Sequence, residues 1–331
     1  MTTRERFHAT MGFGRPDRLP MVEWATYWDK TVDRWLTEGL PQQYAGPDEL
    51  RDFAGLDCWR QYWARPRGAE CPRPPSHGAG ILRTEDEYEA LLPCLYPDPQ
   101  RMLQAIEPWA QAHARGDMVV WLTLEGFFWY PRTLFGIQGH LYAFYDEPDL
   151  MHRMNRDLLA WNLRTIDHFC TMTTPDFATL AEDMSYNHGP MLSRELFDEF
   201  IAPYYRDLAG ALERRGIIPI VDSDGDVTEL VPWLESAGLR GILPLERMAG
   251  VDVRRLRRDH PRLLMIGAFD KTVMHRGEAA MRQEFERLLP TMRSGGFIPS
   301  VDHQTPPDVS WKTYHTYLRL LAEYAEKGAP R

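Results

Sequence analysis

The sequence predicts an α/β protein, a (β/α)8 TIM barrel with helical and loop excursions near its N-terminus. From about residue 176 onward, short apolar runs alternate with amphipathic stretches at intervals of roughly 25 to 40 residues, the rhythm of parallel strands joined by crossover helices. Along the whole chain there are eight such apolar runs, and 331 residues suffice for a barrel with insertions. The alternative, an open nucleotide-binding sheet, lacks its glycine-rich or Walker loop. We treat residues 1–331 as a single domain.

The predicted strands are short runs that are apolar on both faces, as in a buried parallel sheet. The clearest is Ile217–Val221, which runs directly into Asp222, Asp224 and Asp226 around Gly225. The other predicted strands are Leu19–Trp24, the segment around Trp59–Trp63, Met118–Leu124, Asp176–Ala181, Gly241–Leu245, Leu263–Gly267 and Phe297–Val301.

The helices are predicted from apolar residues three and four positions apart, with glycines near their ends. Residues 66–80 are rich in Pro and Gly and predict a long surface excursion. The predicted helices are Thr3–Met11, Asp29–Glu38, Glu85–Leu91, Pro99–Arg115, residues 130–145, Pro148–Met172, Arg194–Arg215 with a kink at Pro203, Val227–Ser236, Val251–Asp259, Glu278–Arg293 and Val309–Ala325.

Composition narrows the classes of partner. A net charge of −10 argues against nucleic acid or an anionic membrane as the main partner. No segment resembles a signal peptide or a membrane span, and the four cysteines form no CxxC pair, so we expect a cytoplasmic chain with reduced thiols. Eleven Trp, with fourteen each of Tyr and Phe, fit either core packing or a ligand pocket lined with rings.

Acidic residues follow the predicted strands. In a barrel, strand ends converge on one mouth, where ligand chemistry is placed. Such acids can simply cap the next helix, which is our interpretation of Asp226 and Asp270. The acids that we expect at the mouth are Glu23, Glu125, Glu182, Asp183, Asp222, Asp224, Glu246, Asp270 and Asp302.

Acids packed this closely repel one another unless they are protonated, paired with a base or bound to a cation. The mouth should therefore hold a metal, a cationic substrate group or a carboxyl of raised pKa. Arg132 and Lys271 lie near strand ends and could pair with the acids. N-terminal arginines could also fold over the mouth, namely Arg4, Arg6, Arg15 and Arg18.

His303 follows a predicted strand and could serve as a general acid, a metal ligand or a substrate hydrogen-bonding group. We predict that His303, Asp222, Asp224 and Glu182 are catalytic. Tyr130 and Tyr186 lie just past acidic strand ends and could supply hydroxyl groups. The predicted substrate-binding set is Glu23, Glu125, Asp183, Tyr130, Tyr186, Glu246 and Asp302.

Four blocks of the chain resemble the uroporphyrinogen decarboxylase superfamily. They are RERFHATMGFGRPDRLP, EDMSYNHGPMLSRELFDEFIAPYY, VDSDGDVTELVPWLESAGLRGILPLE and GGFIPSVDHQTPPDVSW. The resemblance covers nearly the whole chain and implies a (β/α)8 barrel. It implies either the decarboxylation of the heme pathway or the transfer of methyl groups between small molecules, corrinoid proteins and thiols.

Two departures from the superfamily bear on the chemistry. The thiol-alkylating methyltransferases hold Zn²⁺ with a His-x-Cys pair and a further Cys, where this chain has Asp222, Asp224 and the Asp302-His303 pair. A divalent metal such as zinc would need oxygen and nitrogen ligands, with Asp222, Asp224, Glu246 and His303 as candidates; otherwise no metal binds. The arginine-rich loop with which the decarboxylase grips its polyanionic substrate is absent.

We expect a methyltransferase that demethylates a small O-, N- or S-methyl compound, with a corrinoid, free or protein-bound, as its partner. The acid cluster with His303 would bind the leaving heteroatom or protonate it. One alternative is a decarboxylase or related lyase acting on a tetrapyrrole or another carboxylated substrate. A further alternative is a non-catalytic binder of a tetrapyrrole or an amine. The resemblance also implies a homodimer.

Overall fold

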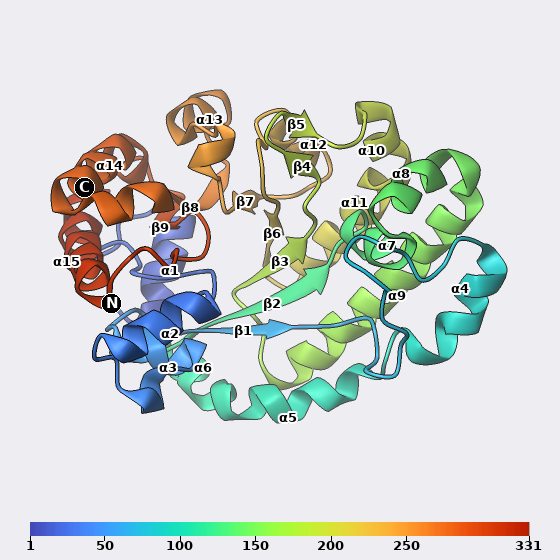
Figure 1. Cartoon of the computed structure of the whole chain (residues 1–331), viewed down its shortest axis with the longest axis horizontal. Helices are drawn as coiled ribbons and strands as arrows, with labels where there is room; N and C mark the ends of the chain where they lie inside the picture. The colour runs from blue at the N-terminus through green and yellow to red at the C-terminus, as the bar shows by residue number, and fades with distance from the viewer. Residues whose placement is uncertain (331) are drawn as a thin grey trace.

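Seven parallel strands form the sheet that positions the candidate site in the computed structural model, which describes residues 1–330 (Figure 1). Their order in the sheet equals their order in the chain, so each connection leads to the neighbouring strand, as in a barrel. The strands are β1 (Trp59–Trp63), β2 (Val119–Glu125), β3 (Phe177–Ala181), β6 (Ile218–Asp222), β7 (Gly241–Leu243), β8 (Leu264–Phe269) and β9 (Phe297–Val301). The predicted α/β barrel class is confirmed, and seven strands lie within two residues of their predicted bounds.

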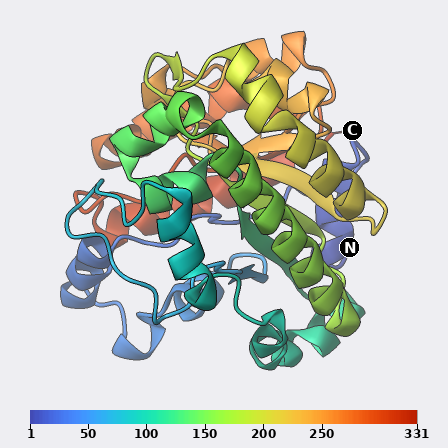
Figure 2. The ribbon, with the colours of Figure 1, turned by 90° about the vertical axis from the view of Figure 1, so that its right-hand side faces the viewer.

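Helices pack outside the sheet, and the long helix α9 crosses diagonally in front of it in Figure 2. The predicted helix from Arg194 is divided just before Pro203, as the kink predicted. The helices are α1 (Thr3–Met11), α2 (Asp29–Thr37), α3 (Pro47–Phe53), α4 (Glu85–Leu91), α5 (Leu103–Ile106), α6 (Ala110–Arg115), α7 (Trp129–Phe135), α8 (Ile137–Asp146), α9 (Pro148–Met172), α10 (Arg194–Phe200), α11 (Ala202–Glu213), α12 (Val231–Ser236), α13 (Val253–Asp259), α14 (Glu278–Met292) and α15 (Trp311–Lys327). A small antiparallel pair, β4 (Ser185–Tyr186) and β5 (Gly189–Pro190), follows β3.

The predicted strand Leu19–Trp24 is wrong, because this segment joins no strand ladder. Two of its N–H groups donate to side chains: Met21 N donates to Asp57 Oδ2 (2.9 Å), and Trp24 N donates to Ser300 Oγ (3.4 Å). Asp57 lies just before β1 and Ser300 lies in β9. The segment therefore contacts both edges of the open sheet and occupies the place of the eighth strand.

The interior of the sheet is filled by alternate side chains of the strands. This inner cluster contains Trp59, Trp121, Ile220 and Ile298 among others, and Phe7 and Met11 of α1 join it. The Phe7 ring stacks on Phe177 with centroids 5.3 Å apart. Because α1 packs against the strands at their N-terminal ends, open space remains at the opposite end, where side chains can meet a ligand.

Arg4, Arg6 and Arg18 do not fold over the mouth, contrary to prediction. Arg4 Nε donates to Asp176 Oδ1 (2.6 Å), and Asp176 immediately precedes β3, at the closed end of the barrel. Arg6 and Arg18 bond to Asp57 at 3.2 and 2.7 Å, just before β1. These cations therefore neutralise buried acids at the end opposite the candidate site.

The expectation of reduced thiols is wrong for two cysteines. Cys71 and Cys94 form a disulfide with their Cα atoms 5.2 Å apart, whereas Cys58 and Cys170 are free. Sequence spacing gave no sign of this pairing, because the loop between residues 66 and 80 folds back onto residues 92–97. Within residues 1–330, no helix is both long enough and apolar enough to cross a membrane.

Candidate active site

A cavity of about 290 Å³ opens at the carboxyl ends of the strands. In barrels of this class, the loops at that end carry the chemistry, while the opposite end serves stability. The residues that line the cavity are Trp24, Ala25, Thr26, Gln61, Trp63, Trp129, Ala181, Glu182, Asp183, Asp222, Asp224, His303 and Gln304. Five of them were predicted as site residues from the sequence: Glu182, Asp183, Asp222, Asp224 and His303.

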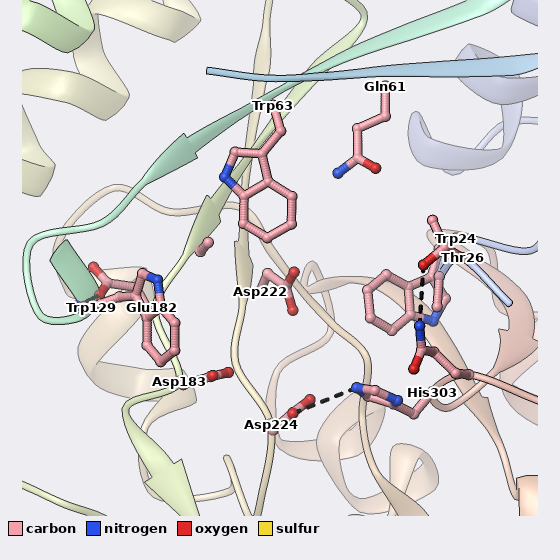
Figure 3. Close-up of a pocket in the computed structure, with 13 residues that line it drawn as sticks. Trp24, Thr26, Gln61, Trp63, Trp129, Glu182, Asp183, Asp222, Asp224 and His303 are labelled. Atoms are coloured by element: carbon pink, nitrogen blue, oxygen red, sulfur yellow. Dashed lines mark hydrogen bonds and ion pairs between the residues drawn. The ribbon is translucent and has the colours of Figure 1, made fainter. Parts of the chain in front are cut away.

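Asp183, Asp222 and Asp224 lie in the cavity, whose lining contains no Lys or Arg among residues 1–330, and Asp222 occupies its centre (Figure 3). Burial raises the pKa of Asp222 well above its usual value, and the charges of Asp224 and Asp183 raise it further. Burial also raises the pKa of Asp183. Asp183 has a φ of +46°, in the left-handed region that Asp tolerates better than most residues. The predicted convergence of Asp183, Asp222 and Asp224 is confirmed.

Asp224 and His303 face each other across the cavity, with Asp224 Oδ2 3.7 Å from His303 Nε2 (Figure 3). Burial and the charges of Asp183 and Glu246 raise the pKa of Asp224 to about 7, although Lys271 opposes them. Burial lowers the pKa of His303, and Lys271 contributes to the same effect. The pair can therefore hold a proton on the carboxyl beside a neutral imidazole near neutral pH.

Three tryptophan rings line the same cavity and were not predicted. Trp63 lies at the end of β1, Trp129 begins α7, and Trp24 ends the segment that contacts both sheet edges. Figure 3 shows the three indoles on different sides of Asp222. Trp24 and Trp63 each end a strand or predicted strand, so the rule that found the acids would also have found them. Trp129 lies beyond the loop that follows β2, where that rule does not reach.

Glu182 lines the cavity, but its carboxylate is turned to the backbone. Its oxygens accept hydrogen bonds from Phe127 N (2.8 Å), Phe128 N (2.9 Å) and Trp129 N (2.9 Å), and the Tyr205 hydroxyl donates to the same group. Burial raises the pKa of Glu182 to about 8, although these N–H donors oppose the shift. The contacts fix the loop that carries Trp129; a catalytic role for Glu182 stays a prediction.

Gly126 allows this arrangement. A Cβ atom at position 126 would lie 2.1 Å from the Glu182 carboxyl group, far closer than any real contact. The glycine after β2 therefore lets the carboxylate reach the N–H groups of the following loop.

Lys271, Glu246 and Asp302 form a charged group beside the cavity but do not line it. Lys271 Nζ lies 3.3 Å from Glu246 Oε1 and 4.0 Å from Asp302 Oδ1, which confirms Lys271 as a partner of the acids. Glu246 Oε2 also accepts from Gly225 N (3.1 Å). Asp302 is fully buried and accepts from Arg247 N (3.0 Å) and Lys271 N (3.2 Å), and burial raises its pKa to about 6.

Besides Glu246 and Asp302, four predicted substrate-binding residues lie outside the cavity lining. Glu23 is buried and accepts from Ser300 Oγ (3.2 Å), and burial raises its pKa to about 7. Glu125 pairs with Arg65 at 3.2 Å. Tyr130 is fully buried in α7 beside Tyr96, and Tyr186 is exposed on β4. The structure does not bring these side chains to the acid cluster.

Arg132 does not pair with a carboxylate as predicted; its Nη1 donates to the backbone oxygen of Asp183 (3.3 Å). Of the two acids interpreted as helix caps, Asp270 is confirmed, because its Oδ1 accepts from Thr272 N (2.8 Å) at the start of the 3-10 helix η6 (Lys271–Arg276). Asp226 Oδ1 accepts from Thr228 N (3.0 Å) in a turn before α12, whose N-cap is Leu230, so Asp226 does not cap that helix.

The predicted metal ligands do not form a metal site in this geometry. Across residues 1–330, no group of three or more His, Cys, Asp or Glu side chains is arranged to hold a metal ion. Glu246 pairs with Lys271 and accepts a hydrogen bond from Gly225 N. Of the four predicted ligands, only Asp222, Asp224 and His303 line the cavity.

The chain belongs to the uroporphyrinogen decarboxylase (URO-D) family, whose model matches residues 135–324. This confirms the resemblance of the sequence blocks. No curated protein matches the sequence.

Solved structures show the same fold at low sequence identity. A methyltransferase from Methanosarcina mazei aligns with 98% of this chain and 99% of its own, with a TM-score of 0.66 and 12% identity. A B12-independent methionine synthase from Shewanella sp. W3-18-1 aligns with 67% of this chain and 65% of its own, with a TM-score of 0.39 and 12% identity. The first likeness establishes the fold, and the second is too slight to bear on function.

Proposed function

We propose that this protein is an enzyme that removes a methyl group from a small O-, N- or S-methyl compound and passes it to a reduced corrinoid, free or protein-bound. The observation that carries the proposal is the Asp224–His303 pair, 3.7 Å apart in a small cavity at the barrel mouth. Membership of the URO-D family and a fold shared with a methyltransferase support it.

The chemistry depends on the leaving heteroatom. An alkoxide or amide leaves poorly, so cleavage of its bond to methyl is aided by an acid that protonates it. A carboxyl group with a pKa of about 7, such as Asp224, keeps a proton near neutral pH and can donate it. His303, as a neutral imidazole, can accept or return a proton at the other side of the pair.

The remaining residues that line the cavity bind the substrate and orient it. The cavity of about 290 Å³ suits a small molecule, at the lower end of ligand pockets. Trp24, Trp63 and Trp129 supply apolar walls that exclude water, and Glu182 holds the backbone of Trp129 in place.

The test is methyl transfer to cob(I)alamin under reducing conditions, followed by the visible absorbance of methylcobalamin, across a panel of O-, N- and S-methyl donors. With a neutral O-methyl donor, Asp224→Asn should lower the rate roughly 10²- to 10⁴-fold, the usual contribution of a general acid. Asp226→Asn makes the same charge change two residues away, outside the cavity, and should leave the rate near that of the wild type. A folded protein that transfers no methyl group from any donor contradicts the proposal.

Decarboxylation of a tetrapyrrole is the alternative that the family description suggests. Uroporphyrinogen is a polyanion, and three carboxyl groups, those of Asp183, Asp222 and Asp224, face the cavity. Incubation with uroporphyrinogen and mass analysis for loss of CO₂ separates the two activities, and CO₂ loss at a catalytic rate would favour the lyase.

A further inference from the structure

We infer that the substrate of this site is a methylated ammonium cation, held between the tryptophan rings and the carboxylates of the cavity. The inference deepens the proposed function, on which its transfer step rests, by naming the class of methyl donor. It depends on three features of the cavity: the sign of its charge, its aromatic walls and the absence of a counter-charge for its central acids.

The first feature is charge. The lining includes Glu182, Asp183, Asp222 and Asp224, and among residues 1–330 neither Lys nor Arg joins that lining. Glu182 is already satisfied by backbone N–H groups, which leaves three carboxyl groups facing the space. A cavity with this lining attracts cations and repels anions.

The second feature is the aromatic wall. Trp24, Trp63 and Trp129 line one small cavity, and tryptophan is the ring that attracts a cation most strongly through its face. Arg65 already lies over the Trp63 ring (3.7 Å to the centroid), and Arg132 lies near the Trp129 ring (5.2 Å). Neither arginine lines the cavity, so the indole surface inside it stays available to a ligand.

Rings and carboxylates together select a particular shape of cation. An ammonium group covered by methyl groups carries a diffuse charge and an apolar surface, which suits indole faces better than it suits water. A simple metal ion or a bare ammonium would need close oxygen ligands, and no group of three candidate ligands is arranged for a metal within the described chain.

The third feature is the missing counter-charge. The charges of Asp224 and Asp183 raise the pKa of Asp222, and those of Asp183 and Glu246 raise the pKa of Asp224. Lys271, which opposes the shift of Asp224, is bound to Glu246. A cation between the acids would supply the compensation that the protein itself does not, and would lower both pKa values.

The transfer step balances for this class of donor. The methyl carbon of the ammonium bonds to the reduced corrinoid, which acts as the second substrate and supplies the electron pair for the new bond. The C–N bond breaks with its electron pair remaining on nitrogen, and a neutral amine leaves. No proton is needed in that step, so with an ammonium donor the carboxylates act through their charge. The acid role of the Asp224–His303 pair in the proposed function then applies only to neutral O-, N- or S-methyl donors.

Binding tests this without any assay of methyl transfer. Choline and 3,3-dimethylbutan-1-ol have nearly the same shape, but only choline carries a charge. Titration calorimetry, or quenching of tryptophan fluorescence, should show choline binding at least about tenfold more tightly. Equal binding of the uncharged analogue would overturn the inference.

Variants separate the two kinds of contact. Trp63→Leu keeps an apolar wall without a ring and should weaken choline binding about five- to thirtyfold, whereas Trp63→Phe should weaken it less. Asp222→Asn should also weaken choline binding, while Asp226→Asn, outside the cavity, should not. Unchanged choline affinity in folded Trp63→Leu and Asp222→Asn proteins would place the cation elsewhere and overturn the inference.

The inference and the proposed function fail in different ways. If neutral O-methyl donors pass their methyl group to cob(I)alamin while cations do not bind, the methyltransferase proposal stands and the substrate class is wrong. If ammonium cations bind through Trp63 and Asp222 but no donor is demethylated, the substrate class stands and methyl transfer is wrong.

Discussion

The two ends of the barrel treat buried carboxylates in opposite ways. At the closed end, Asp176 is fully buried and is contacted by Arg4 (2.6 Å), His8 (2.6 Å) and His113 (2.9 Å). At the mouth, Asp222 and Asp224 face a cavity whose lining offers no Lys or Arg among the described residues.

The pKa directions report the same difference. Burial alone would raise the pKa of Asp176, but hydrogen bonds from His113, His8 and Arg4 hold it well below its usual range. Burial raises the pKa of Asp222 and Asp224 without such compensation. A compensated buried charge supports the fold, whereas an uncompensated one costs stability and is retained where a ligand can compensate it.

The largest expected effect on stability comes from removing the buried carboxylate at the closed end of the barrel. Asp176→Ala should lower the free energy of unfolding by about 3–5 kcal/mol, because it leaves buried donors without their acceptor. Asp176 also accepts a hydrogen bond from Val120 N (3.1 Å), so the N-terminal end of β2 loses that hydrogen bond as well. Urea unfolding followed by circular dichroism measures the change.

An exposed pair provides the control for that experiment. Arg115 and Asp117 lie 2.8 Å apart with more than half of each side chain exposed, so Asp117→Ala should leave the unfolding midpoint nearly unchanged. If Asp176→Ala left the unfolding midpoint as little changed as Asp117→Ala, the ion pairs at the closed end would not be stabilising the fold.

The pH dependence of stability should show the two ends separately. The lowered pKa of Asp176 adds stability that is present above about pH 4 and is lost as the pH falls. The pKa of Asp224, raised to about 7, adds stability that is full below about pH 4 and is lost as the pH rises through 7. Asp302, with a pKa of about 6, acts in the same direction.

We therefore expect the free energy of unfolding to fall between pH 5 and pH 8, by roughly 1–2 kcal/mol from Asp224 and Asp302 once solvent screening of the half-exposed Asp224 is allowed for. Glu23 and Glu182, with pKa values raised to about 7 and about 8, add to this fall. Asp224→Asn should make this decline shallower. Unfolding curves at one-unit pH steps measure it, and stability that rises toward pH 8 would contradict the assignment of uncompensated acids to the mouth.

The sequence predicts most of this fold because buried parallel strands are apolar on both faces, a pattern that β8 shows without interruption. It fails at Leu19–Trp24, because an apolar run does not reveal which groups accept its N–H bonds. Here the Asp57 carboxylate and the Ser300 hydroxyl replace a strand ladder. The Cys71–Cys94 disulfide was missed because it depends on how an irregular loop folds back.

The candidate site is predictable in part for a similar reason. Position after a strand identifies Asp183, Asp222 and His303, but it does not give the direction of a side chain. Glu182 occupies an equivalent position, yet its carboxylate turns to the N–H groups of the next loop. Glu125 turns to Arg65 instead of the cavity. Which carboxylates face the cavity is therefore decided by side-chain contacts that no sequence pattern reveals.

The smallest expected effect on stability is that of Asp222→Asn. It tests most directly whether the acids at the mouth lower the stability of the fold while they strengthen ligand binding. Asp222→Asn removes an uncompensated charge with little change of shape, so at pH 8 it should raise the free energy of unfolding by about 0.5–1 kcal/mol. At pH 4 the wild-type carboxyl is largely protonated in the folded state, so the gain should nearly vanish. The same variant should bind choline more weakly, and a loss of stability at pH 8 would mean that Asp222 has a compensating partner inside the protein.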